Sequence, residues 1–514
     1  MSDSDIAANN RRIAKNTLYL YGRMLIGVAV SLYTSRITLN ALGVEDYGVY
    51  NVVGGIMSLF WIVTGSMTAA IGRFITFELG RGDMDRLRRT FASSVTIMLF
   101  LSLLIILVTE TVGVWFLNNR MVIPQERMFA ANWVLQLTMV SFVISLVCTS
   151  YNACVTAHEK MSAFAYISLF DAFAKLLCAT LITRVPFDKL IFIASYSFII
   201  GIIVRIIYGA YCKRHFEECH YRFIFDRQLL KQMFGFAGWN FIGAASAVLR
   251  DQGGNIILNL YGGPIVNAAR GIAMRVSGVV GGFANNFTAA MNPQITKYYA
   301  QGDNKHTMDL LFRGGRLAYY MLLMIALPVL INTEYVLWLW LGQIPEHAPL
   351  FLRLVLLFSM SDIISGPLIT AMLATGNIRN YQIVVGGLQM LNLPVSYILL
   401  RIGCIPETVM IVAIVLSQCC LAARLFMLRS MIGLSSKLFL RNVYMNVLIV
   451  SIVAAALPLL FALSGETTLP RFIASCSMCL VCTTLAILYV GCSRQERKTV
   501  GAKIYAYRKK YLRI

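Results

Sequence analysis

Acidic residues are scarce in this sequence, which has 24 Asp and Glu residues against 45 Lys and Arg residues in a length of 514. Charged residues of both signs make up only 13% of the chain, whereas hydrophobic residues make up 58% and the mean hydropathy is +0.69. A soluble domain cannot remove so much apolar surface from water. The composition therefore excludes an ordinary soluble protein and predicts a membrane protein with many spans.

Long polar loops are absent as well, since no segment between apolar runs exceeds roughly 25 residues. This leaves no room for an extramembrane catalytic domain, and the loops are short of the paired acids that a membrane glycosyltransferase or polymerase needs. The sequence also lacks a Gly-Lys-Ser/Thr phosphate loop, so we expect no ATP hydrolysis. We expect the protein not to be an enzyme and to need no cofactor.

The start of the chain, "MSDSDIAANNRRIAKN", lacks the apolar core and the small-residue cleavage site of a signal peptide. We therefore expect no removable leader. Arg11, Arg12 and Lys15 instead favour a first helix whose N-terminus lies in the cytoplasm.

Twelve cysteines raise the question of disulfides or a metal. The run "CSMCLVC" spaces Cys476, Cys479 and Cys482 three residues apart but lacks the fourth ligand that a cluster normally has. The segment "HFEECH" (His215 to His220) has metal-binding residue types but lies in a basic segment that we expect to be a solvated loop. We expect the cysteines to behave mainly as small hydrophobic residues and predict no metal site.

Apolar runs of the length that crosses a bilayer recur with short polar breaks, which predicts about fourteen transmembrane helices. The expected spans are 17–40, 48–72, 91–117, 128–154, 162–184, 188–211, 233–260, 265–292, 314–341, 350–374, 380–401, 407–428, 440–463 and 471–492. They group into an N-terminal six-helix bundle (1–215), a cytoplasmic linker (216–232), a C-terminal six-helix bundle (233–430), an additional helix pair (438–493) and a basic cytoplasmic tail (494–514). The fold class is thus all-α integral membrane.

Lys and Arg alone predict the orientation of these helices. With the N-terminus inside, the cytoplasmic loops hold 30 of these residues and the outer loops hold six. This asymmetry predicts a multi-pass membrane protein with both termini in the cytoplasm. The net charge of +21 is then a topology signal facing anionic lipid head groups, and nucleic-acid binding is not needed to explain it.

An internal repeat relates the two bundles. "TLNALGVEDYGVYNVV" is similar to "ILNLYGGPIVNAARGIA", and "AIGRFITFELGRGDMDRL" to "AMNPQITKYYAQGDNKHTMDLL", with Gly82-Asp83 answering Gly302-Asp303. Six helices per unit give both units the same orientation, so the repeat is parallel. Two bundles related in this way are typical of transporters.

Several cations fall inside the expected spans. A charge at mid-bilayer is costly unless it faces water or a partner. A cavity lined by arginines attracts anions, and the planar guanidinium matches phosphate through parallel donors. For Arg36 and Arg270 the alternative is that the side chain extends to the membrane interface. The expected cationic set is Arg23, Arg36, Arg250, Arg270, Arg275 and Arg353.

Polar residues near these arginines complete the candidate site. Amide side chains on the seventh and eighth spans are suited to bind sugar hydroxyls: Asn240, Asn255, Asn285 and Asn286. The candidate coupling acids are Asp171, Asp251 and Asp362, since intramembrane carboxylates often carry protons. Asp171 lies one turn before Lys175, so a purely structural ion pair is an equal alternative there.

The pattern Arg36…Leu42-Gly43…Asp46-Tyr47-Gly48-Val49-Tyr50 resembles the polysaccharide-biosynthesis transporters, the lipid-linked oligosaccharide flippases of bacteria. The resemblance continues through "GSMTAAIGRFITFELGRGDMDRLRRTF" and "NPQITKYYAQGD". It implies the superfamily of multidrug, oligosaccharidyl-lipid and polysaccharide exporters, in which two six-helix bundles enclose a cavity and some members carry two additional helices.

The resemblance further implies an undecaprenyl-diphosphate-linked glycan as substrate, of O-antigen or lipopolysaccharide type, moved from the cytoplasmic to the periplasmic leaflet. The expected partners are this glycan lipid, the surrounding membrane lipids, and H⁺, Na⁺ or the membrane potential as energy source. A lipid II flippase is an alternative, because its substrate shares the diphosphate. A multidrug or cation antiporter is a second alternative, but it needs acids in the cavity and the first span has none.

Overall fold

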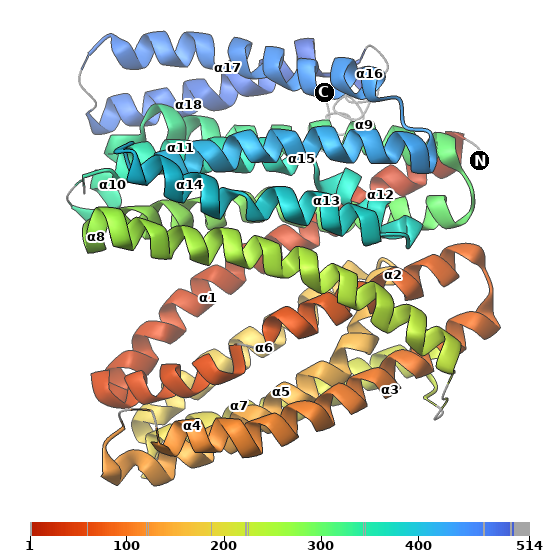
Figure 1. The fold of residues 1–514 in the computed structure, drawn as a ribbon, viewed down its shortest axis with the longest axis vertical. Coiled ribbons are helices and arrows are strands. Elements are labelled where there is room, and N and C mark those ends of the chain that lie inside the picture. Colours follow the sequence, from red (N-terminus) through yellow and green to blue (C-terminus); the bar gives the residue numbers. More distant parts are fainter. Residues whose placement is uncertain are drawn as a thin grey trace, which may run out of the picture. The chain divides into compact units, whose positions relative to one another are not determined.

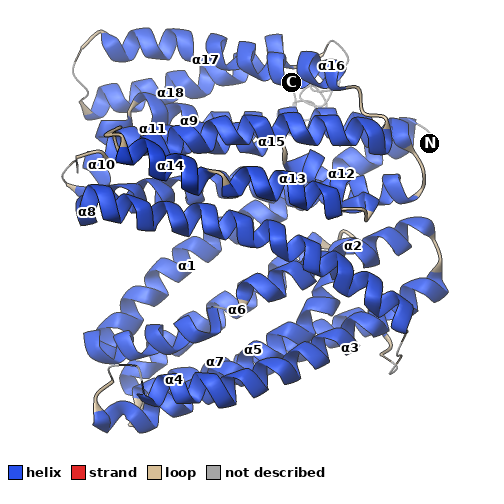
Figure 2. Ribbon diagram, viewed as in Figure 1, coloured by secondary structure: helices blue, strands red, loops and turns tan. Residues whose placement is uncertain are grey.

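The structure is a computed structural model that describes residues 3–58, 60–119, 121, 123–186, 188–221, 224, 226–342, 344, 346–465, 468–493 and 496–497. Every regular element in these ranges is helical and no strand occurs among them (Figure 2). The all-α membrane fold class is therefore confirmed. Most of the expected basic tail (494–514) lies outside the described residues.

The elements up to residue 221 cover the region of the first six expected spans, but the expected span 48–72 is divided between the first two helices. They are α1 (Asp3–Ser58), α2 (Trp61–Arg81), α3 (Met84–Val108), η1 (Thr109–Gly113), α4 (Val114–Asn119), η2 (Gln125–Arg127), α5 (Met128–Ala157), α6 (Met161–Leu181), η3 (Ile182–Arg184), α7 (Lys189–His215) and η4 (Glu217–Cys219).

The remaining elements cover the expected second bundle and the helix pair. They are α8 (Arg227–Ala300), α9 (Asn304–Ile331), α10 (Thr333–Leu341), α11 (Ala348–Ile363), α12 (Gly366–Thr375), α13 (Arg379–Met390), α14 (Asn392–Arg401), α15 (Thr408–Ile432), α16 (Ser436–Phe439), η5 (Leu440–Tyr444), α17 (Met445–Leu463), α18 (Leu469–Ala486) and η6 (Ile487–Gly491).

Helices α1 and α8 each continue through a turn that the sequence predicts as a loop. A straight helix of the 74 residues of α8 would be about 110 Å long at 1.5 Å per residue, far beyond a bilayer. Arg270 Nη1 nevertheless donates to the carbonyl of Asp251, 19 residues earlier, at 3.1 Å. Residues Thr34 and Tyr50 of α1 likewise line one cavity. Both helices therefore fold back, and each contains what the sequence divides into separate spans.

Nine helical segments of the described residues are long and apolar enough to cross a membrane, or ten if the bent pair α11 and α12 counts as one span. The bend between these two helices is 42°. Helices α1, α2 and α8 are not among the segments that pass this test. The total of fourteen spans stays a prediction.

The first of two compact units contains residues 1–245, 290–302 and 376–379. Its central helix is α5, which packs against α1, α2, α3, α6 and α7. Small and branched apolar side chains fill the contact, including Ala131, Val134 and Leu135 of α5 with Leu117 and Leu190, all fully buried. Close packing of this kind replaces lipid contacts in membrane helix bundles.

An ion-pair network holds the turn of α1 inside this unit. Arg127, just before α5, donates to both carboxylate oxygens of Asp46. The same guanidinium donates to Asp188, the residue that caps the N-terminus of α7, at 2.7 Å. Asp46 is part of the motif that carries the family resemblance, and its role in the structure is to hold this turn against α5 and α7.

The second unit contains residues 246–289, 303–375 and 380–514. Helix α15 packs against α11, α12 and α14, while α9 packs against α11 and α12. The additional pair α17 and α18 lie side by side and both contact α9 (Figure 1). A hydrogen bond between the Tyr319 and Ser451 hydroxyls, at 2.8 Å, joins this pair to α9. Asn332, which caps the C-terminus of α9, donates to Ser475 at 3.0 Å.

The repeat is visible in the local geometry of its two Gly-Asp pairs. Gly82 and Gly302 both have positive φ angles, 77° and 73°, a conformation that glycine adopts without strain. Asp83 and Asp303 then cap α3 and α9, each accepting a hydrogen bond from the backbone N–H three residues later. A matching turn before α3 and before α9 is what the sequence repeat predicts.

Candidate functional site

A small cavity in the second unit contains two of the expected arginines, and we call it the cationic pocket. Its volume is about 130 Å³. It is formed by α8, α11, α14 and α15. Its lining residues are Arg250, Asp251, Arg270, Met274, Ser277, Val355, Phe358, Ser359, Asn392, Val409, Met410 and Ala413.

Arg270 is buried, with only 3% of its surface exposed. Its Nη1 group donates to the Asp251 carbonyl at 3.1 Å and to the side-chain oxygen of Asn255. Its Nε–H is buried without a hydrogen-bond acceptor. Neither of these two acceptor atoms carries a full charge, and the Asp251 carboxylate, which acts on Arg270 through space, is shared with Arg250. A buried guanidinium in these surroundings favours an anionic ligand.

Arg250 is held differently, although it lines the same cavity. Its Nε and Nη2 groups donate to the two carboxylate oxygens of Asp251 at 2.9 and 3.3 Å. Its guanidinium also lies over the ring of Phe358, 5.0 Å from the ring centre, a geometry favourable for a cation. The neighbouring acid therefore neutralises part of the positive charge that the sequence assigns to this site.

The pocket as a whole holds two guanidinium groups and one carboxylate, which leaves a positive charge. Pockets that enclose a drug-sized ligand are typically about 300–1,000 Å³, so this cavity is suited to a small anionic group such as a phosphate. Ser277 and Ser359 share a hydrogen bond of 2.8 Å in its wall and offer further polar contacts. The two guanidinium groups can therefore bind an anion through paired N–H donors.

The arginines expected on the first helix lie in the first unit. Arg23 of α1 is half-buried, and its guanidinium lies 4.8 Å from the ring centre of Phe164. Its Nε–H is buried with no hydrogen-bond acceptor, so Arg23 keeps a donor free for an anion. The side chain of Arg36 lies outside the described residues.

The other expected cations and amides lie outside the pocket lining. Arg275 is exposed on α8, and Arg353 of α11 forms an ion pair with Glu334 at 3.4 Å. Glu334 lies in the first turn of α10 and provides Arg353 with a counter-charge from a different helix. Asn285 is exposed, while Asn240, Asn255 and Asn286 are partly buried on α8.

The three candidate coupling acids occupy different surroundings. Asp171 accepts a hydrogen bond from Lys175 at 2.7 Å, and both line a cavity of about 410 Å³ in the first unit. Asp251 is the counter-ion of Arg250. Asp362 is half-buried at the end of α11, within electrostatic range of Arg424.

Arg424 is a buried charge that lies within the expected span 407–428 but is not in the expected cationic set. It lies inside α15, is only 2% exposed, and has Nε and Nη1 groups without a hydrogen-bond acceptor. Tyr381 of α13 and Asp362 of α11 lie beside it. Both neighbours belong to other helices, so the burial of this arginine follows from helix packing and has no signal in its own span.

The segment "HFEECH" also differs from its expectation. It is not a solvated loop, because Glu218 and Cys219 in the short helix η4 are 1% and 0% exposed. Phe216, which is buried as well, draws the segment into the first unit by stacking on His158, with 4.1 Å between ring centres.

The relationship of this sequence to known proteins agrees with the fold. The sequence model of a family described as polysaccharide biosynthesis protein matches residues 13–299. The chain belongs to this family. The match covers all of the first unit's continuous sequence from residue 13 and the whole of the α8 hairpin up to Tyr299.

One relative is an uncharacterized membrane protein, EpsK, of Bacillus subtilis (strain 168), with 19% identity over 326 residues. The chain spans 63% of that protein's length, and the match covers 62% of this chain.

Solved structures of similar fold are multidrug transporters. A crystal structure described as MATE in the straight conformation superposes with a TM-score of 0.72 and 12% identity, covering 83% of this chain and 96% of the other. The outward-facing conformation of a multidrug resistance MATE family transporter of the MOP superfamily gives 0.70 and 12%, covering 82% of this chain and 96% of the other. This likeness establishes that the chain shares the fold of these proteins. The protein is a multi-pass membrane protein of the polysaccharide-biosynthesis family.

Proposed function

We propose that this protein moves an undecaprenyl-diphosphate-linked oligosaccharide from the cytoplasmic to the periplasmic leaflet of the bacterial inner membrane by alternating access. The observation that carries the proposal is the cationic pocket, in which Arg250 and Arg270 converge around Asp251. Family membership supports a substrate from polysaccharide synthesis, and a diphosphate is the anionic part of such a lipid.

The pocket chemistry suggests how the head group is bound. Arg270 has a buried Nε–H donor without an acceptor, which a phosphate oxygen satisfies directly. Arg250 exchanges Asp251 for the second phosphate, because bidentate guanidinium–phosphate contacts are at least as strong as the carboxylate pair. Arg23, Arg36, Arg275 and Arg353 serve as further cations during transport, and Asn240, Asn255, Asn285 and Asn286 as contacts for sugar hydroxyls.

When the substrate displaces Asp251 from Arg250, the freed carboxylate can take up a coupling ion. Substrate binding and ion binding would then be linked. A carboxylate that loses its guanidinium partner in a low-dielectric site binds a proton or a cation more readily. Asp251 is therefore our first candidate for coupling to H⁺, Na⁺ or the membrane potential. Asp171 and Asp362 are the other candidates, the first beside Lys175 and the second near Arg424.

The alternatives differ in substrate charge or in the attached glycan. A lipid II flippase carries the same diphosphate, so the pocket fits it equally. A multidrug or cation antiporter needs a surplus of acids, whereas the cationic pocket holds a surplus of guanidinium groups. The pocket charge therefore favours a diphosphate lipid over a cationic drug.

The test is binding of undecaprenyl diphosphate to the purified full-length protein in lipid nanodiscs, together with glycan export in cells that lack the native gene. Arg250→Ala and Arg270→Ala should weaken binding by about 10–100-fold, since a hydrogen bond to a charged group contributes about 1.5–3 kcal/mol. Arg250→Lys should keep part of the affinity. Arg401→Ala, at the exposed end of α14, is the matched control.

Two results would contradict the proposal. The first is wild-type affinity and export in both Ala variants, provided that they reach the membrane in normal amounts. The second is accumulation of cationic dyes in cells without the protein, with unchanged amounts of lipid-linked glycan on the inner leaflet. Export that fails only for peptidoglycan precursors would select the lipid II alternative.

A further inference from the structure

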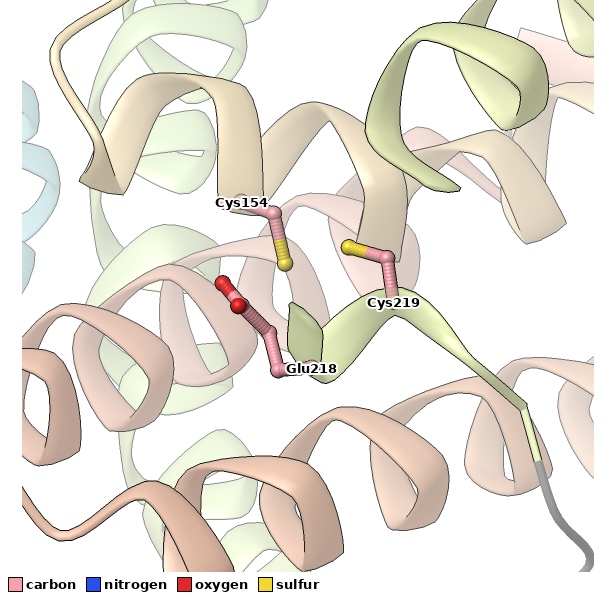
Figure 3. Close-up of side chains that lie close together, drawn as sticks. All are labelled: Cys154, Glu218 and Cys219. Carbon is pink, nitrogen blue, oxygen red and sulfur yellow. The ribbon is translucent and has the colours of Figure 1, made fainter. Parts of the chain in front are cut away.

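Three side chains with metal-binding atoms meet at one end of the first unit (Figure 3). Cys154 lies in the last turn of α5, and Glu218 and Cys219 lie in the short helix η4 that follows α7. Figure 3 shows the Cys154 thiol and the Glu218 carboxylate directed toward one another, with the Cys219 thiol on the third side. The two elements are more than sixty residues apart in sequence.

The geometry of this group is that of a small chelate. One ligand atom from each residue lies within 4.8 Å of the others, and all three residues are buried. A third thiol, that of Cys212 in the last turn of α7, is also fully buried and is a hydrogen-bond partner of Cys219. Three potential ligands therefore converge out of contact with solvent, and a third thiol lies beside one of them.

The surroundings hold the carboxylate in place, as the outer contacts of metal sites do. His158 Nε2 lies 2.6 Å from Glu218 Oε1, and the His158 ring is stacked on Phe216. The Cys212 thiol lies 3.5 Å from the carbonyl of Tyr151. Hydrogen-bonded carboxylates and fixed ring orientations are the usual supports of metal ligands.

A buried carboxylate beside three buried thiols is an unusual combination for simple packing. Cysteine alone fits an apolar core, but burying a carboxylate carries a desolvation cost of several kcal/mol that one histidine contact only partly offsets. A divalent cation offsets this cost and converts the thiols to thiolates. Thiolate ligands exclude Ca²⁺ and Mg²⁺ and favour Zn²⁺, which takes four sulfur, nitrogen or oxygen ligands in a tetrahedron.

We propose that Cys154, Cys219 and Glu218 bind a structural Zn²⁺ ion, with Cys212 as the fourth ligand. The site joins the end of α5 to the end of α7 and to the segment that leads into α8. It fixes the path of the chain between the last helix of the first expected bundle and the α8 hairpin. This role is independent of which lipid the transporter carries.

A disulfide is the main competing state of these cysteines. The expected topology places this end of the first unit in the cytoplasm, where thiols are kept reduced. Reduced, buried and convergent thiols with a carboxylate neighbour are more typical of a metal site than of a redox pair. The experiment must therefore be able to detect a disulfide.

The experiment uses the full-length protein in detergent, purified with reductant and stripped of metal by a chelator. One equivalent of Co²⁺ should produce thiolate-to-cobalt charge-transfer absorption and the visible bands of a tetrahedral site, and one equivalent of Zn²⁺ should remove both. Cys154→Ser and Cys219→Ser should lower the Co²⁺ affinity at least tenfold. Cys178→Ser, which replaces a buried cysteine of α6 outside the cluster, should behave as the unchanged protein.

Because the cluster variants can fail to fold, a second measurement uses the unchanged protein alone. Zn²⁺ should slow alkylation of Cys154, Cys212 and Cys219, followed residue by residue by mass spectrometry, without slowing that of Cys178. Absence of the charge-transfer bands at one equivalent of Co²⁺ would overturn the proposal. A disulfide between Cys154 and Cys219 in protein prepared from cells with thiols trapped before lysis would overturn it as well.

Discussion

At the scale of a single residue, Glu159 illustrates how specific contacts stabilise a buried charge. It follows α5 with a φ angle of 58°, in a left-handed conformation that glycine usually takes at this position. Its side chain is only 2% exposed and accepts hydrogen bonds from Lys297 at 2.9 Å and Gln294 at 3.1 Å. The backbone strain is retained because this carboxylate holds the end of α8 within the first unit.

Two substitutions of Glu159 distinguish the energetic cost of its strained backbone from the stabilisation by its ion pair. We expect Glu159→Ala to lower the free energy of unfolding by about 3 kcal/mol, because it leaves the Lys297 ammonium without its acid. Glu159→Gly should cost about 1 kcal/mol less than Glu159→Ala, since glycine adopts the left-handed conformation freely. Denaturant unfolding in micelles, followed by circular dichroism, measures both variants. Equal losses in the two variants would show that strain plays no part.

Asp303 is a second residue whose charge has a local structural role, at the start of α9. It accepts hydrogen bonds from the backbone N–H and from the ring of His306, at 3.1 and 2.6 Å. Burial alone would raise the pKa of Asp303, but these two hydrogen bonds and the charge of His306 together lower it below its ordinary value. The folded state therefore favours the ionised carboxylate.

The sign of this shift predicts a pH dependence. A carboxyl group with a depressed pKa stabilises the fold above its unfolded pKa, about 3.9, and loses this contribution as the pH falls through the lower folded value. Asp303→Ala should therefore cost about 1 kcal/mol at neutral pH, the usual value of a helix cap, and much less near pH 2. Thermal unfolding at several pH values measures the difference.

The matched control for this cap is Asp83→Ala, which removes the equivalent cap of α3. Asp83 accepts a hydrogen bond from the Arg86 backbone at 3.0 Å. A loss in Asp303→Ala that stays constant from neutral to acid pH would contradict the argument, because it would show that the charge of Asp303 contributes nothing.

At the scale of elements, the pair α17 and α18 depends on α9 for its attachment. Arg316 of α9 donates to the Gly491 carbonyl at 3.2 Å and to Glu496 at 2.8 Å. Burial alone would raise the pKa of Glu496, but the Ser493 N–H and the charge of Arg316 lower it below its ordinary value. The ion pair therefore holds the chain that leaves α18 against α9.

Removing Arg316 should weaken this attachment while leaving the rest of the second unit intact. We expect Arg316→Ala to lower the thermal midpoint and to increase proteolytic cleavage between α15 and α16, because α9 loses its contacts with the chain after α18. Arg313→Ala is the control, since Arg313 is more exposed and pairs mainly with Asp309 on its own helix at 2.8 Å. Equal cleavage in both variants would show that Arg316 does not hold the chain after α18 against α9.

At the scale of the whole molecule, the distribution of Lys and Arg predicts which loops face the cytoplasm. Cys404 provides a native probe, because it is exposed in the turn between α14 and α15. The expected orientation places this turn in the periplasm. The turn after α8 at Gln301 belongs to the opposite side.

A membrane-impermeant maleimide should therefore label Cys404 in cells with a permeabilised outer membrane. The signal should disappear in Cys404→Ser. A cysteine placed at position 301 in that variant, Gln301→Cys, should be labelled only after the inner membrane is opened. Labelling of position 301 in cells with an intact inner membrane would contradict the expected topology.

Much of the fold was predictable from sequence, because membrane helices are encoded locally. Apolar runs of bilayer length and short polar breaks indicate where helices lie, and the Gly-Asp pairs at 82–83 and 302–303 indicate where they begin again. The exceptions are α1 and α8, whose helical backbone runs on through expected loops. Gly253, where an added Cβ would clash with Leu393 of α14, illustrates how closely α8 packs against a helix distant in sequence, a property that no local pattern reveals.

The candidate site was predictable only in part. Arg250, Arg270 and Asp251 were identified because a charge inside a span is rare in itself. Arg424 was missed because the residues beside it, Tyr381 and Asp362, lie on other helices, and only packing shows that this charge is buried. Arg353 was assigned to the cavity because its partner, Glu334, lies on another helix and cannot be recognised when each span is considered alone.

The sequence by itself determined the membrane class, the helical fold and the family, because hydropathy, helix caps and a repeated motif are properties of neighbouring residues. Only the tertiary structure decided which charges are neutralised and which thiols converge. The pairing of Arg250 with Asp251, the unfilled donor of Arg270 and the meeting of Cys154 with Glu218 and Cys219 all depend on helix packing. Packing brings together residues that the chain itself keeps apart, and it sets both the charge of a cavity and the ligands of a metal.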